Sequence, residues 1–203
     1  MSAFLGPIHY WLYNKIQHQD SILNDIYKSY DQAGLQLKEE ANKLYGSLEE
    51  GPLDEIIDQS NIHGWLQERV SQVEYNYAYV ITKLLEEDQT NLNKLKSILK
   101  ASGEKEGQKL VGSSPTAKDL YKLSSECLLD GMPCDRANEL LDNTDSLVSW
   151  KRNLCVHEQY WQEIGGDINI YYDLRHAWME GLTADYDFRF TKTNSDLYKI
   201  EAI

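Results

Sequence analysis

The sequence predicts an all-α protein, an up-and-down helical bundle of four long helices with shorter ones and an extended C-terminal tail. Apolar residues recur over long segments at alternating spacings of three and four, which is typical of helices that face a core. Glycine or proline marks the end of most of these segments. The chain of 203 residues is 41% apolar, which suffices for a real core, and we expect one domain spanning residues 1–203.

Three helical regions are predicted in the N-terminal half of the chain. The first helix spans about residues 4–32 and ends at Gly34. A shorter helix follows, and a Gly-Pro pair breaks it at residues 51–52. The longest periodic segment covers residues 53–87 and continues or resumes over residues 89–100.

The middle of the chain is predicted to alternate between loop and helix. Residues 102–114 are rich in glycine and charge and lack apolar periodicity, so we expect a mobile loop there. The helix after this loop stops at Gly131. Another helix opens near Pro133, is interrupted at about residues 142–145, and runs to the double glycine at residues 165–166.

The C-terminal part begins with the last predicted helix, over about residues 167–181. A tail of residues 184–203 follows, in which residues 186–190 alternate like a strand or an extended strap. This is the one place where the pattern favours extended backbone.

Charge and composition narrow the classes of partner. The formal net charge of −13 argues against nucleic acid and anionic membranes, because both are polyanions. No apolar stretch is long enough to span a membrane, and the start of the chain lacks the basic flank of a secretory signal, so we expect a cytoplasmic protein. Three cysteines without CxxC spacing disfavour a disulfide framework. A homodimer remains open, and the sequence identifies no small-molecule substrate.

The most informative pattern in the chain is a histidine that is followed closely by a tryptophan. Four of the five histidines are each followed within four residues by a tryptophan: His9, His63, His157 and His176. The first three also fall in the apolar stripes of predicted helices. A buried imidazole needs a polar partner, and a metal ion shared by several of them is a natural one.

The predicted bundle brings these histidines toward one site. His9 and His63 lie in the N-terminal parts of helices that run in the same direction, so they belong near one end of the bundle. His157 lies close to the C-terminal end of an oppositely directed helix and joins them. We therefore expect these three ring systems to converge.

Carboxylates are predicted to complete the metal site. Asp173 and Glu180 share a helical face with His176, as ligands or as groups that orient the imidazole. Glu74 has a weaker claim, because it lies beside the apolar stripe of its own helix. The predicted metal ligands are His9, His63, His157, His176, Asp173 and Glu180.

One imidazole per facing helix, together with carboxylates, resembles in architecture the hemerythrin-like and ferritin-like metal-binding bundles, without their Glu-x-x-His or His-x-x-x-Glu signatures. The resemblance implies a transition metal in the bundle. We expect iron or zinc, and iron would suit a redox or oxygen-related role. The alternatives are a non-catalytic helical interaction protein without metal and a bundle that holds haem through two histidines. No catalytic residue is predicted, and whether the protein is an enzyme stays open.

Cys134 is the cysteine with most chemical interest. It follows Pro133 at an expected helix N-terminus, where the helix dipole favours a thiolate, although Asp135 opposes this effect. A reactive or metal-binding thiol and an ordinary residue of a capping turn are both open.

Overall fold

The computed structural model describes residues 4–112, 114–193 and 196–203, which form two compact units that the chain visits in alternation. Unit 1 contains the residues up to Gln89 together with Cys127–Cys134 and His157–Asp167. Unit 2 contains Thr90–Glu126, Asp135–Val156 and the chain from Ile168 onward. We expected a single bundle domain, whereas the contacts of the described residues group into two units.

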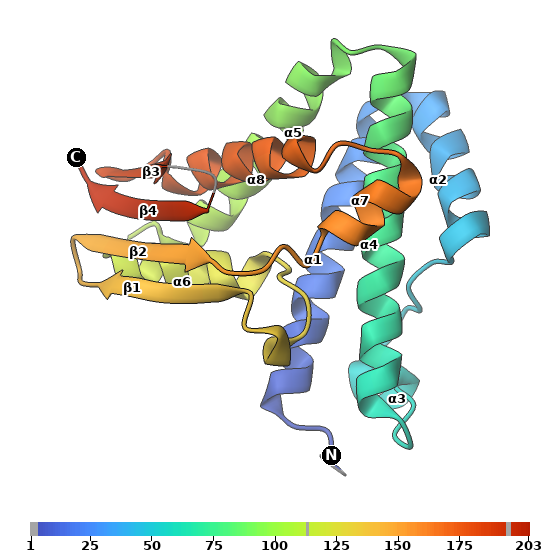
Figure 1. Ribbon diagram of the computed structural model, residues 1–203, viewed down its shortest axis with the longest axis horizontal. Helices are drawn as coiled ribbons and strands as arrows, with labels where there is room; N and C mark the ends of the chain where they lie inside the picture. Colours follow the sequence, from blue (N-terminus) through green and yellow to red (C-terminus); the bar gives the residue numbers. More distant parts are fainter. Residues whose placement is uncertain (1–3, 113, 194–195) are drawn as a thin grey trace. The chain divides into compact units, whose positions relative to one another are not determined.

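Unit 1 is built on three long helices and two short ones. They are α1 (Pro7–Ser29), α2 (Asp31–Tyr45), α3 (Leu53–Ile56), α4 (Ile62–Glu87) and α7 (Glu158–Ile164). Helices α1 and α4 lie side by side in Figure 1, and α2 contacts both of them. The helical character expected for this half of the chain is confirmed.

The break between α1 and α2 falls earlier than predicted. It lies at Tyr30 and Asp31, where Asp31 takes a positive φ of 49°. Gly34 was expected to stop the first helix, but it lies inside α2. A Cβ on this glycine would stand 2.0 Å from the carbonyl oxygen of Tyr27, so glycine is needed there for close approach of the two helices.

The core of unit 1 lies between the apolar stripes of α1 and α4. Leu12, Ile16, Leu66 and Val73 are among its buried members. Leu129, from the segment Cys127–Cys134, belongs to the same cluster. The stripe at alternating three and four spacing therefore predicted which faces of these helices are buried, although it could not predict that a distant segment joins them.

Unit 2 contains α5 (Asn91–Gly107) and α8 (Ile168–Thr183), which cross at very close range. A Cβ on Gly103 would stand 1.9 Å from the carbonyl oxygen of Trp178, and one on Gly181 would stand 2.0 Å from that of Lys100. Only glycine lets the two backbones approach this far.

The mobile loop predicted for residues 102–114 is wrong over much of its length. Helix α5 continues to Gly107, and the turn η1 (Gln108–Leu110) follows it. Ser113 lies outside the described residues. Two of the three glycines that suggested a loop, Gly103 and Gly107, instead allow α5 to approach α8 closely.

Unit 2 also contains a four-stranded antiparallel sheet, so the prediction of an all-α protein is wrong in this part. The strands are β1 (Asn138–Asn143), β2 (Leu147–Arg152), β3 (Phe188–Lys192) and β4 (Leu197–Ala202), in the order β1-β2-β4-β3. Strand β2 occupies residues that we expected to be helical. The predicted strand character of residues 186–190 largely coincides with β3 and is confirmed.

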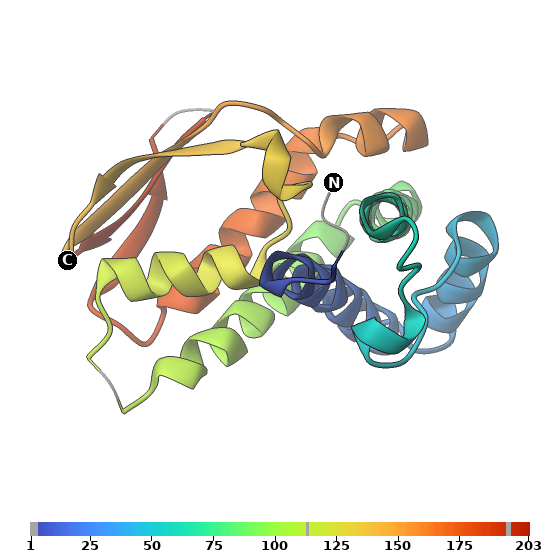
Figure 2. The same ribbon diagram turned by 90° about the horizontal axis from the view of Figure 1, so that it is seen from below.

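One face of this sheet is apolar and the other polar. Val148 and Trp150 on β2 lie opposite Ile200 and Tyr198 on β4, and all four are buried. Helix α6 (Ala117–Cys127) covers this face, where the ring of Tyr121 contacts that of Trp150, and α8 covers it as well (Figure 2). The intervening side chains of β2 and β4 alternate to the other face, as the period of two requires.

The crossing of α5 and α8 leads to a stability prediction. Gly103→Ala should destabilise the protein by roughly 1–3 kcal/mol, because overpacking forces the helices apart. In an open helical position the same change would stabilise by up to about 1 kcal/mol. Urea unfolding followed by tryptophan fluorescence measures the difference. Lys105→Ala, at an exposed position of α5, is the control and should leave the midpoint nearly unchanged. A stabilised Gly103→Ala protein would contradict the close crossing.

Candidate functional site

Two of the predicted metal ligands lie together in unit 1. His9 is in the first turn of α1 and His63 is in the first turn of α4, and both helices begin at the lower end of the view in Figure 1. The two Nε2 atoms are 3.3 Å apart. His9 is buried and His63 is exposed, so the pair lies at the surface of the unit.

The hydrogen bonds of His9 define where its proton lies. The backbone N–H of Gly6 donates to Nδ1 of His9 over 2.9 Å, so this nitrogen carries a lone pair. A neutral His9 then carries its proton on Nε2 and donates it to Nε2 of His63. The two imidazoles thus satisfy each other without an ion. A metal on His9 Nε2 would displace this proton.

His157 lies in a different part of unit 1. It precedes α7 rather than lying within a helix, and its Nδ1 is 3.0 Å from Oε1 of Glu74 on α4. Glu74 is about three turns beyond His63 on α4, or roughly 16 Å of helical rise. The structure therefore brings His9 and His63 together and places His157 elsewhere.

His157 is held between two carboxylates. Its Nε2 is 3.7 Å from Oδ1 of Asp130, and its side chain and that of Glu74 are both almost completely buried. Burial opposes the charged imidazolium, but the carboxylates of Glu74 and Asp130 outweigh it and raise the pKa of His157 to about 9. At neutral pH the side chain of His157 is therefore a charged imidazolium between two carboxylates. A charged imidazole has no lone pair for a metal.

The remaining predicted ligands lie on α8 in unit 2 and have local partners. Nε2 of His176 is 3.5 Å from Oε1 of Glu180, one helical turn away. The carboxylate of Asp173 forms an ion pair with Lys96 at 2.9 Å. These side chains are half-buried or exposed, unlike the buried ligand set that we expected.

Cys134 does not lie at the start of an α-helix. It is part of the three-residue turn η2 (Pro133–Asp135) and is exposed. A single 3₁₀ turn lacks the aligned peptide dipoles that were expected to favour a thiolate. The basis for a reactive Cys134 is thereby removed.

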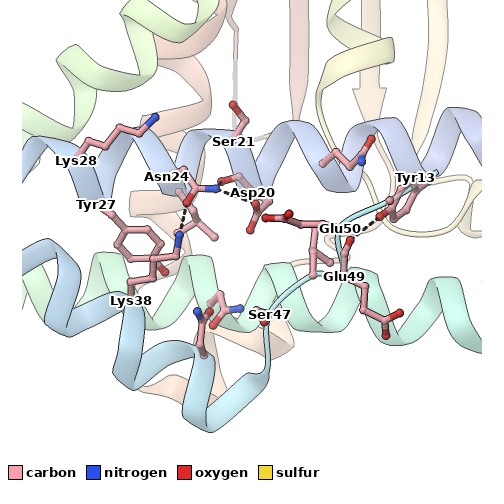
Figure 3. A pocket seen from close by; sticks show the side chains of 16 residues that line it. Tyr13, Asp20, Ser21, Asn24, Tyr27, Lys28, Lys38, Ser47, Glu49 and Glu50 are labelled. Carbon is pink, nitrogen blue, oxygen red and sulfur yellow. Dashed lines mark hydrogen bonds between the residues drawn. The ribbon is translucent and has the colours of Figure 1, made fainter. Parts of the chain in front are cut away.

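A polar pocket in unit 1 was missed by the sequence analysis. It has a volume of about 760 Å³ and lies between α1, α2 and the loop that follows α2, with α4 contributing one side chain (Figure 3). The residues that matter for its chemistry are Asp20, Asn24 and Tyr27 on α1, Lys38 on α2, Glu50 in the loop and Asn76 on α4.

A chain of hydrogen bonds connects the two charged groups on the pocket wall. Nζ of Lys38 donates to Oδ1 of Asn24 over 2.8 Å, and Nδ2 of Asn24 donates to Oδ2 of Asp20 over 2.9 Å. Burial raises the pKa of Asp20, while the nearby Lys38 and the Asn24 hydrogen bond act against this shift. The pocket therefore presents a carboxylate and an ammonium group held at a fixed spacing.

Two further polar groups on this wall have unused hydrogen-bonding capacity. Tyr27 is 6% exposed, and its hydroxyl makes no hydrogen bond to any described residue. Burial, with the nearby Asp20 carboxylate, raises the pKa of Tyr27 and keeps the phenol protonated. Asn76 donates to the carbonyl of Gly46 over 3.0 Å, but its own Oδ1 is buried without a partner in the described chain.

Comparisons of this chain with protein-family models, with curated protein sequences and with solved structures find no match. Among the described helices, none combines the length and the apolar character that a membrane crossing requires. The function must therefore be argued from the residues of the chain.

The His157 cluster predicts a stability that depends on pH. The folded protein binds the proton more tightly than the unfolded chain, so the contribution is complete below pH 6.5 and is lost as the pH rises to about 9. The loss should be on the order of 3 kcal/mol, and urea unfolding across this range measures it.

Matched variants identify the source of this pH dependence. Glu74→Gln removes the stabilising charge and should flatten the dependence above pH 6.5, with a lower stability at every pH. His176→Gln in unit 2 is the control and should retain the wild-type slope. A wild-type stability that stays constant between pH 6.5 and 9 would refute the imidazolium assignment.

Proposed function

We propose that unit 1 binds a small polar molecule in the pocket between α1, α2 and the following loop. The observation that carries this proposal is the Tyr27 hydroxyl, which lines the pocket and has no hydrogen-bond partner among the described residues. Asn76 is a second residue of the same wall, and its Oδ1 is buried without a partner in the described chain.

The Tyr27 hydroxyl can bond to a ligand without losing a bond within the described protein, and one such hydrogen bond contributes about 0.5–1.5 kcal/mol. A polar atom buried without a partner costs about 1–3 kcal/mol, so a ligand that donates to Oδ1 of Asn76 would also recover part of that cost. The pocket volume of about 760 Å³ lies within the range of roughly 300–1,000 Å³ that is usual for ligand sites. The net charge of −13 favours a small ligand over a polyanion such as nucleic acid.

Removal of one hydroxyl tests this function. Ligand-observed NMR with a mixture of amino acids, polyols, diamines and dicarboxylates should detect at least one binder to the wild-type protein. Tyr27→Phe should weaken that binding about tenfold, which corresponds to ~1.4 kcal/mol for one hydrogen bond. The melting temperature should not fall, because the hydroxyl has no protein partner to lose.

Tyr10→Phe provides the matched control on the same helix, since Tyr10 is exposed and lies outside the pocket. It should bind the ligand as the wild type does. Binding that is equally strong in Tyr27→Phe and wild type would place the ligand elsewhere, and a mixture without any binder would reject the pocket as a ligand site.

A second candidate function is the binding of a transition metal, zinc or iron, by His9 and His63. Two ligands of one zinc ion, each about 2.0–2.1 Å from it at a tetrahedral angle, stand roughly 3.3 Å apart. The Nε2 atoms of the pair are separated by 3.3 Å. Two features oppose this candidate: the proton on His9 Nε2, and the position of both residues at helix N-termini, where the dipole disfavours a cation.

Measurement of the metal content tests whether His9 and His63 bind zinc or iron. If the pair binds metal, protein purified without a chelating tag should contain zinc or iron, and His63→Gln should lose it because coordination geometry is lost while polarity is kept. His176→Gln should retain the metal content. Elemental analysis that finds neither metal in the wild-type protein, before and after incubation with zinc, would reject this role.

A further inference from the structure

Building on the proposed ligand site, we infer that the pocket recognises a small zwitterion of the α-amino acid type. The observation is the placement of one carboxylate, Asp20, and one ammonium group, Lys38, on either side of the Asn24 amide (Figure 3). Each of these charged groups retains free hydrogen-bonding capacity toward the pocket.

The free capacity can be counted atom by atom. Lys38 has three N–H donors and uses one of them on Asn24, so two are free among its described contacts. Oδ2 of Asp20 accepts from Asn24, and its Oδ1 has no hydrogen bond to a described residue. A ligand can therefore accept from Lys38 and donate to Asp20 at the same time.

Asn24 shows the polarity that such a ligand needs. Its amide oxygen accepts from Lys38 and its amide nitrogen donates to Asp20, through a short O–C–N bridge. An α-amino acid has a carboxylate oxygen and an ammonium nitrogen separated by two carbon atoms, with the same polarity. It can span the same two groups beside Asn24, with charge-assisted hydrogen bonds at both ends.

Two of the nearby rim charges are balanced by their neighbours, and a third favours an ammonium group. Lys28 is 3.7 Å from Asp25, and Glu49 is 3.0 Å from Arg69, so both carry an opposite charge beside them. The carboxylate of Glu50 lies on the wall opposite Asp20 in Figure 3. It favours an ammonium group on the ligand.

Other classes of small ligand fit less well. A sugar usually stacks on an open aromatic face, but Lys38 lies over Tyr27 and the ring of Tyr13 contacts Trp65. A diamine would meet the ammonium group of Lys38, and a dicarboxylate would meet the carboxylate of Asp20. Only a ligand with both charges is complementary to the wall.

The pocket is larger than the backbone of one amino acid, so the side chain of the ligand also fits inside. The groups that surround the remaining space include the side chains of Asn42, Ser47 and Glu50, which are polar or acidic. A polar or basic side chain is therefore favoured over an apolar one.

The test uses the full chain and a defined panel of probes. Ligand-observed NMR is run with each of the common L-amino acids and with sorbitol, cadaverine and succinate. At least one polar or basic amino acid should bind, and the three other compounds should not. The amine made by removing the carboxylate of that amino acid, and the acid made by removing its α-amino group, should each bind at least about tenfold more weakly.

Variants of the protein assign the binding to the two charged groups. Lys38→Met and Asp20→Asn should each weaken amino-acid binding about tenfold or more. Lys43→Met, exposed on α2, and Asp54→Asn, exposed on α3, are the charge-matched controls and should bind as the wild type does. Circular dichroism checks that each variant is folded, and the two pocket variants test the inference independently.

The outcomes separate this inference from the proposed function. Binding of sorbitol, cadaverine or succinate in the pocket, with no amino acid bound, would overturn the zwitterion and leave the ligand site intact. Amino-acid binding that survives both Lys38→Met and Asp20→Asn would also overturn it. A panel in which nothing binds would overturn both the inference and the proposed function.

Discussion

The imidazolium of His157 between Glu74 and Asp130 is the interaction on which unit 1 depends. Each of these residues comes from a different stretch of the chain: α4, the segment Cys127–Cys134, and the segment that leads into α7. His157 and Glu74 are both buried and are tolerable only together, because either charge without the other would carry a large desolvation cost. Asp130 is half-buried and adds a second carboxylate beside the imidazolium. The cluster therefore defines where two returning segments attach to the first three long helices.

Helix α4 links this cluster to the ligand pocket. Glu74 and Asn76 are two residues apart, so they point to different sides of the helix. On one side Glu74 contacts His157; on the other, Asn76 donates to the carbonyl of Gly46 and holds the loop that closes the pocket. Gln72 supports the same loop through the carbonyl of Ser47 at 3.1 Å. The rotation of α4 about its own axis thus determines the position of Glu74 in the His157 cluster and the position of Asn76 at the pocket.

The sequence predicted what depends on local periodicity. The stripes of α1 and α4 gave the buried faces, and the N-terminal positions of His9 and His63 predicted that they meet. Strand β2 was misread because Leu147, Trp150 and Leu154 imitate helical spacing, while the alternation of Val148 and Trp150 with polar neighbours is the period that the sheet uses.

The pocket also left a signal in the sequence, but it was not recognised. Its α1 wall is formed by residues at alternating spacings of three and four, namely Tyr13, Gln17, Asp20, Asn24 and Tyr27. A polar stripe of this kind looks the same as a solvated helix face unless one knows that α2 and its loop cover it. The contact of His157 with Glu74 could not be predicted either, since the intervening chain forms most of another unit.

The alternation of the chain between two units determines the order in which they can be completed. A ribosome releases α1 to α4 long before it releases His157, so Glu74 lacks its counter-ion while α5, α6 and the first two strands are synthesised. Unit 2 in turn lacks α8 and half of its sheet until α7 has passed. Neither unit is formed by one continuous stretch of the sequence. Both are completed only when residues distant in sequence come into contact, and contacts of this kind slow folding.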